Sequence, residues 1–120
     1  MVTEKELQDR TKTFALRVVK LVAALPNTAI GRQVGGQLLR SATSVGANYR
    51  AACRGHSKRE FIAKLCIVEE EADECAYWLE LIIDGGVMGS NRVGDLLKEA
   101  NEILAIIIAS RKTASRRCKQ

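Results

Sequence analysis

This chain of 120 residues contains little proline, histidine or aromatic side chain: one proline, one histidine and five aromatics. Its longest uninterrupted apolar run, residues 103–109, falls far short of the roughly 18 residues that cross a bilayer. The charged N-terminal segment lacks the apolar core of a signal peptide. The sequence therefore predicts a cytoplasmic protein without a membrane segment, long enough for a single domain over residues 1–120.

Metal and catalytic motifs are also missing. The four cysteines form no CxxC pair, and His56 lies near only one of them, so we expect reduced thiols and no zinc site. Five acids crowd residues 69–74, but a di-metal bundle needs inward carboxylates and Glu-x-x-His motifs. A solvated or interface role is favoured for these acids over a metal site. We expect no enzyme, no cofactor and no small-molecule substrate.

What the chain does have is apolar residues at helical spacing. The pattern predicts four helices, over residues of about 3–25, 28–54, 57–84 and 90–115. Pro26 ends the first helix, Ser57 and Glu60 form a capping box for the third, and Gly85 with Gly86 ends the third. Because the three connections are short, consecutive helices should be antiparallel. The predicted fold is all-α, an antiparallel up-down four-helix bundle.

The third helix has the most regular apolar stripe, with steps of four and three residues. The stripe consists of Phe61, Leu65, Val68, Ala72, Cys75, Leu79 and Ile82. The second helix has a similar stripe that includes Ser41 and Asn48, and it is rich in glycine and alanine, which indicates close approach to a neighbour. Its polar residues Arg40, Ser41, Thr43, Ser44 and Asn48 favour a hydrogen-bonded packing network over a binding surface.

The fourth helix is apolar on more than one face. A stripe of Val93, Leu97, Ala100, Leu104 and Ile107 is expected to face the core. Further apolar residues lie on other faces, and a helix that is apolar all round is buried all round. The sequence therefore predicts a subunit interface of a homo-oligomer, with these candidate residues: Leu96, Ile103, Ile106 and Ile108.

Charge is segregated along the chain. Formal net charge is +6 over residues 1–56, −6 over residues 57–110 and +5 over the basic tail, residues 111–120. In an up-down bundle the turn after the second helix and the end of the fourth helix share one end. That end should gather nine cations: Arg50, Arg54, Lys58, Arg59, Arg111, Lys112, Arg116, Arg117 and Lys119. Such a surface binds phosphate backbones through counterion release, although a charge run can also be only a solvated surface.

Three stretches resemble a known family: LLRS at residues 38–41, TSVGANY at residues 43–49 and YWL at residues 77–79. They resemble the bacterial four helix bundle protein family, related to the protein encoded by intervening sequences of 23S ribosomal RNA genes and also called S23 ribosomal protein-like. Arg50 departs from the family pattern, which often has an acid there. The resemblance implies an up-down bundle, commonly a homo-oligomer with five subunits in a ring, and no established enzymatic activity. It also implies kinship with retroelement accessory proteins that bind nucleic acid.

Two functions remain in competition at this level. The favoured hypothesis is a non-enzymatic oligomeric bundle that binds RNA or DNA electrostatically through its basic end. The alternative is a protein-interaction scaffold without a nucleic-acid role, in which the acidic third helix and the basic regions pair with each other between subunits or with a partner.

Overall fold

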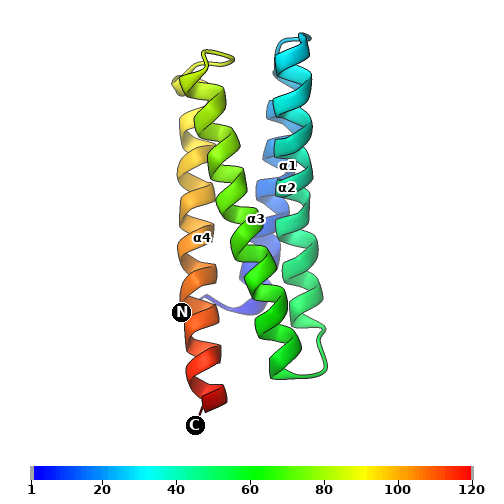
Figure 1. Cartoon of the computed structure of the whole chain (residues 1–120), viewed down its shortest axis with the longest axis vertical. Coiled ribbons are helices and arrows are strands. Elements are labelled where there is room, and N and C mark those ends of the chain that lie inside the picture. The colour runs from blue at the N-terminus through cyan, green and yellow to red at the C-terminus, as the bar shows by residue number, and fades with distance from the viewer. Residues whose placement is uncertain (1, 120) are drawn as a thin grey trace.

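Four antiparallel helices make up the computed structural model, which describes the backbone of residues 2–119 and the side chains of residues 2–116 (Figure 1). The helices are α1 (Glu4–Ala24), α2 (Ala29–Cys53), α3 (Lys58–Asp84) and α4 (Ser90–Lys119). Each helix packs on the next in the chain, and α1 closes the ring by packing more sparsely on α4. The predicted up-down bundle is confirmed, with extents of 51 × 20 × 20 Å. The fourth helix runs to Lys119, four residues beyond the predicted end.

The helix ends follow from local hydrogen bonding. Thr3 and Glu6 form a reciprocal capping box at the start of α1, and the Thr28 hydroxyl accepts from the Gly31 N–H at the start of α2. At α3 the predicted capping box is only half formed. The Ser57 hydroxyl accepts from the Glu60 N–H at 3.1 Å, but the Glu60 carboxylate accepts from the N–H of His56 at 2.7 Å. The glutamate thus satisfies the backbone one residue before the helix cap.

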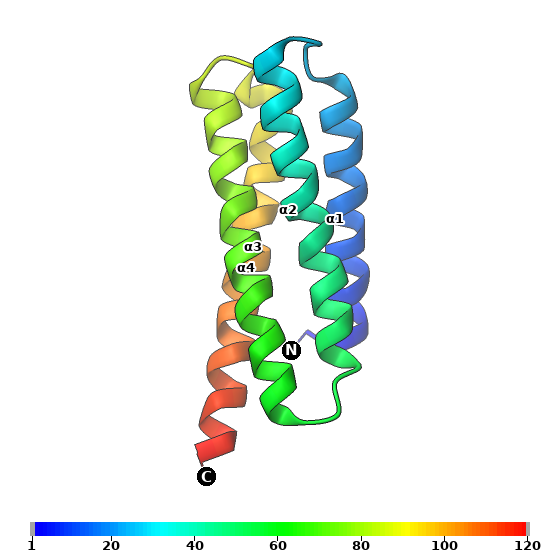
Figure 2. The same cartoon turned by 45° about the vertical axis from the view of Figure 1, so that its right-hand side comes forward.

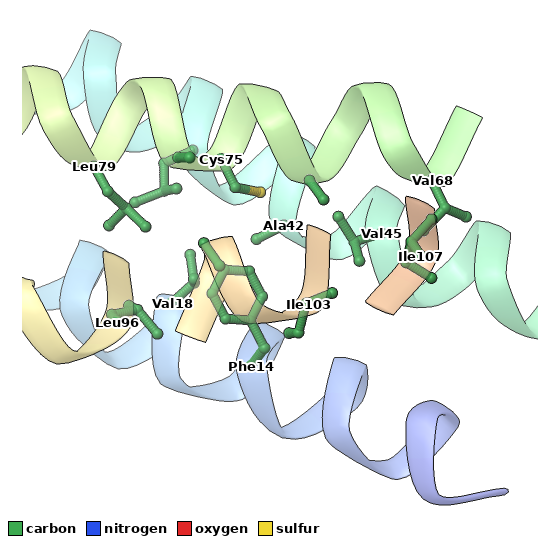
Figure 3. Close-up of a cluster of buried hydrophobic side chains, with 14 of the residues drawn as sticks. Phe14, Val18, Ala42, Val45, Val68, Cys75, Leu79, Leu96, Ile103 and Ile107 are labelled. Carbon is green, nitrogen blue, oxygen red and sulfur yellow. The ribbon is translucent and has the colours of Figure 1, made fainter. Parts of the chain in front are cut away.

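The core follows the predicted stripe of α3, and Figure 3 shows Val68, Cys75 and Leu79 of this stripe among the buried side chains. Six of its seven residues are buried, and Phe61, at the basic end, is half-buried. On α2, Asn48 is only half-buried and Tyr49 is buried instead, so the prediction that Asn48 faces the core is wrong. The Asn48 amide donates to the carbonyl and hydroxyl oxygens of Ser44 on its own helix.

The sequence-based prediction was wrong chiefly about which residues of the fourth helix face the core. Its core stripe passes through Leu96 and Ile103, which are 4% and 1% exposed, whereas Leu97 and Leu104 are half-buried beside it. Figure 3 shows Leu96 and Ile103 in the core with Phe14 of α1. Leu96 and Ile103 therefore cannot form a subunit interface while the bundle is intact, because their own chain already covers them.

The two remaining candidates from that prediction are only partly available. Ile106 and Ile108 are half-buried, and Ile106 packs against the core. The physical reason is that α4 is covered from two sides, by α3 and by α1. A helix that looks apolar on several faces can thus be accounted for largely within one chain.

Small residues let α1 and α2 approach closely. A Cβ atom added to Gly35 would lie 3.1 Å from side-chain carbons of Val22 and Leu25, and one added to Gly46 would lie 3.6 Å from the Thr11 carbonyl oxygen. The predicted close approach is therefore confirmed at these positions. Within the described residues, no helix has the length and hydropathy needed to cross a membrane.

Candidate nucleic-acid interface

The turn between α2 and α3 and the C-terminal end of α4 lie at the same end of the bundle (Figures 1 and 2). This follows from the topology, because α2 and α4 run parallel and both finish there. Six exposed cations belong to this end: Arg50, Arg54, Lys58, Arg59, Lys112 and Arg116. None of them takes part in an ion pair with another described side chain. We call these six residues the basic end.

Arg111 differs from the other predicted cations because its charge is already compensated. Its guanidinium donates to the Glu69 carboxylate of α3 at 2.5 Å, and this hydrogen bond raises the pKa of Arg111. The pair joins α3 to α4 rather than offering a cation to a ligand. The side chains of Arg117 and Lys119, two further predicted contacts, lie outside the described residues.

A groove between α1 and α2 adds two cations that the sequence did not single out. Lys5 and Lys12 of α1 face Arg50 and Arg54 of α2 across a groove of about 480 Å³. The periodicity showed each lysine to be on the outer surface of α1 but could not show which helix would lie beside it. The register between the two helices was the missing information.

Three of the eight acidic residues of α3 form ion pairs with cations of neighbouring helices. Arg40 of α2 pairs with both Glu71 and Glu74, and the Trp78 indole N–H also donates to Glu74 at 3.0 Å. The hydrogen bond from Trp78, followed by that from Arg40, lowers the pKa of Glu74. With the Arg111–Glu69 pair, this arrangement tethers α3 to both of its neighbours.

Of the polar residues of α2, Arg40 and Ser41 bond to another helix, whereas Thr43, Ser44 and Asn48 bond within α2. The buried Cys75 thiol of α3 donates to the Ser41 hydroxyl at 3.4 Å, and that hydroxyl donates to backbone carbonyls of its own helix. Burial raises the pKa of Cys75 to about 12, so the thiol stays protonated. Arg40 and Ser41 thus take part in the network that the sequence analysis favoured over a binding surface.

Ion pairs between side chains reinforce the sparse contact between α1 and α4. Arg10 of α1 binds Glu99 through two hydrogen bonds of 2.7 and 2.8 Å and also binds Glu102 at 2.7 Å. The hydrogen bond from Arg10 lowers the pKa of Glu99. Because bidentate arginine–carboxylate pairs have fixed geometry, this pair adds a specific polar contact between α1 and α4.

The chain is similar to known proteins in both sequence and structure. The sequence model of the 23S rRNA-intervening sequence protein family matches residues 3–109. A crystal structure of a protein of unknown function from the S23 ribosomal protein family of Bacteroides thetaiotaomicron is 36% identical, with a TM-score of 0.83. The similarity covers 88% of this chain and 98% of that one. A search of curated proteins found no match.

Proposed function

We propose that this chain, which belongs to the 23S rRNA-intervening sequence protein family, is a non-enzymatic protein that binds RNA or DNA through its basic end. The observation that carries the proposal is the gathering of six exposed cations at one end, none paired with a described carboxylate. Cations already paired within the fold gain little from a phosphate, whereas unpaired exposed ones release counterions when they bind it.

The contacts expected at this end are with phosphates rather than bases. Of the aromatic residues nearby, Tyr49 is buried and Phe61 is half-buried, so neither offers the open ring face that base stacking needs. Arginine and lysine contacts to phosphates fix a strand by its backbone and carry no sequence information. The proposal is therefore for binding with weak sequence preference.

A salt titration tests the proposal directly. If all six cations contact phosphates, the logarithm of affinity should fall against the logarithm of salt with a slope of roughly −4 for single strands and −5 for duplex. Fluorescence anisotropy of labelled oligonucleotides between 50 and 200 mM salt measures this slope. A wild-type protein that binds neither RNA nor DNA at 50 mM salt contradicts the proposal.

A charge-matched pair of variants shows whether the basic end is the site. Replacing Lys58 and Arg59 by Gln should flatten the slope by roughly 1.4 for single strands, since two phosphate contacts are lost. The control replaces Arg32 and Arg92, exposed cations at the starts of α2 and α4 at the opposite end. If the control weakens binding as much as the first variant, net charge rather than the basic end is responsible.

We also propose that the chain forms a homo-oligomer. The family resemblance leads us to expect a ring of five subunits. The support now comes from α1 and α3 rather than from α4. Leu16 and Val19 of α1 are 56% and 46% exposed, and Tyr77 of α3 is 55% exposed. Leu16 and Val19 lie three residues apart and so share one face of α1, and this exposed apolar face is the surface that we propose a second copy covers.

Light scattering tests the oligomer. Five copies of the 13.2 kDa chain would have a mass of about 66 kDa. Replacing Leu16 by Glu should lower the mass if α1 is in the interface, whereas replacing exposed Glu80 by Gln is a control on α3. A wild-type monomer at working concentration would refute self-association. An oligomer that binds no nucleic acid would favour the alternative function, a protein-interaction scaffold.

A further inference from the structure

The groove between α1 and α2 is a strongly cationic concave surface. Lys5 and Lys12 line it from α1, and Arg50 and Arg54 line it from α2. The only acid in its lining is Asp9, so its formal charge is +3, from four cations and one carboxylate. The groove opens along the side of the bundle and begins at the basic end, where Arg50 and Arg54 belong to both surfaces.

The groove exists because the floor between the two helices is made of small residues. Ala15 lines it from α1, and Gly46 and Ala47 line it from α2. The position of a Cβ on Gly46, 3.6 Å from the Thr11 carbonyl oxygen, shows how closely the backbones approach. With no large side chain on this floor, a ligand can reach the cations on both walls.

Helix register then spreads the cations along the groove. Thr11 lies beside Gly46 in two antiparallel helices, so Lys5 lies toward the level of Arg54 and Lys12 lies further from the basic end. Seven residues of helix separate the two lysines by about 10 Å along the axis. In a B-form duplex each strand carries a phosphate about every 3.4 Å of helix axis, so this length corresponds to about three phosphate steps of a strand that keeps this stacked geometry.

The single acid in the groove is a weak competitor. Asp9 accepts from Lys5 at 3.0 Å, and both side chains are largely exposed. Exposed i,i+4 pairs of this kind contribute only about 0.3–0.5 kcal/mol, so a phosphate can take over the lysine. Lys12, Arg50 and Arg54 are in no ion pair with other described side chains.

We propose that this groove binds two or three consecutive phosphodiesters of one nucleic-acid strand, leading it from the basic end along the side of the bundle between α1 and α2. The inference rests on the proposed function and adds Lys5 and Lys12 to its contacts. No aromatic residue lines the groove, so bases are not stacked there and the strand is held by its backbone.

Removing the two lysines tests the groove separately from the basic end. Replacing Lys5 and Lys12 by Gln should flatten the salt slope for a single-stranded oligonucleotide by roughly 1.4 and lower affinity at 50 mM salt by tens of fold. The matched control replaces Lys20 and Lys98, two exposed lysines outside the groove. Equal losses in both variants would overturn the groove, because they would report net charge alone. Duplex probes measured in parallel show whether the strand is bound single or paired.

Two further variants change the groove in opposite directions. Replacing the exposed Ala47 by Leu fills the floor without changing charge, and Leu is a good helix former, so the fold should be kept. This variant should bind several-fold more weakly with circular dichroism unchanged. Replacing Asp9 by Asn removes the competing carboxylate and should tighten binding. Unchanged affinity in both variants would overturn the groove.

The failure of this inference can be told from the failure of the proposed function. In one outcome, the wild type binds nucleic acid, replacing Lys58 and Arg59 weakens binding, and replacing Lys5 and Lys12 does not. The strand then contacts only the basic end, and the proposed groove site is refuted. If the wild type binds no nucleic acid, both fail. If replacing Lys5 and Lys12 changes the oligomer mass and leaves affinity intact, the groove holds an acidic segment of a second copy and the inference is refuted.

Discussion

Ile103 offers the sharpest test of how α4 is buried. The side chain is 1% exposed within a single chain, so truncating it to Ala removes three buried carbons from the core. At about 0.8 kcal/mol for each methylene, the lost transfer free energy is about 2.4 kcal/mol. The cavity that remains adds to this loss, so we expect a total of about 3 kcal/mol, within the range for large-to-small core substitutions.

Urea unfolding followed by circular dichroism measures this loss. With a slope of roughly 1.5 kcal/mol per molar urea, a loss of about 3 kcal/mol lowers the midpoint by about 2 M. Replacing Ile108 by Ala is the control: its side chain is half-buried, and we expect a loss of about 1 kcal/mol. Since the domain's whole stability is expected to be roughly 5–15 kcal/mol, the difference between the two variants is easily measured.

Protein concentration separates core burial from an interface. Loss of a core contact lowers the midpoint equally at high and low concentration, whereas loss of a subunit contact makes the effect depend on concentration. If the Ile103→Ala variant kept the wild-type midpoint and only lost oligomer mass, the assignment of Ile103 to the core of its own chain would be refuted.

Three further predictions follow from the same contacts. Replacing Glu99 by Gln should cost roughly 1–2 kcal/mol at pH 7, since it weakens a charge-assisted pair with Arg10. Because folding lowers the pKa of Glu99, this stability is present above the unfolded pKa near 4.5 and is lost as pH falls through the folded value. The gap between the urea midpoints of the two proteins should therefore narrow as pH falls below 4.5, and a constant gap would contradict the pair. The buried thiol of Cys75 has a pKa of about 12, so it should resist alkylation by iodoacetamide at pH 8 until urea unfolds the chain. Mass spectrometry of digests measures the labelling, and rapid labelling of the native protein would contradict the burial of Cys75. Replacing Gly36 by Ala should raise the melting temperature, because a Cβ there meets open space and Ala stabilises a helix by up to about 1 kcal/mol relative to Gly. Replacing Gly31 by Ala should lower the melting temperature, because its Cβ would clash with the carbonyl of the preceding loop. Equal shifts in the two variants would refute this contrast.

Much of the fold could be predicted from local patterns. The stripe of α3 repeats every four and three residues over the whole helix, so it predicts which face of that helix is buried. Pro26, Ser57 and the Gly85–Gly86 pair mark helix ends through local backbone geometry and capping hydrogen bonds. The location of the basic end followed from topology, since an up-down bundle brings the ends of α2 and α4 together.

The phase of α4 could not be predicted in the same way. Leu96 and Leu97 are both apolar, as are Ile103 and Leu104, so two adjacent stripes fit the sequence equally well. Neighbouring helices decide between them, because they cover Leu96 and Ile103 and leave the other two at the edge. Leu96 and Ile103, which the sequence predicted to lie at a subunit interface, are core residues.

By itself, the sequence determined the number of helices, their order and ends, and the segregation of charge, because these depend on spacing along one chain. Tertiary structure alone decided which cations remain unpaired, as Arg111 pairs with Glu69 from a segment 42 positions away. It also decided that Lys5 and Lys12 face Arg50 and Arg54 across a groove. Such pairings depend on the register and rotation of whole helices, which are set by how the side chains of different helices fit together.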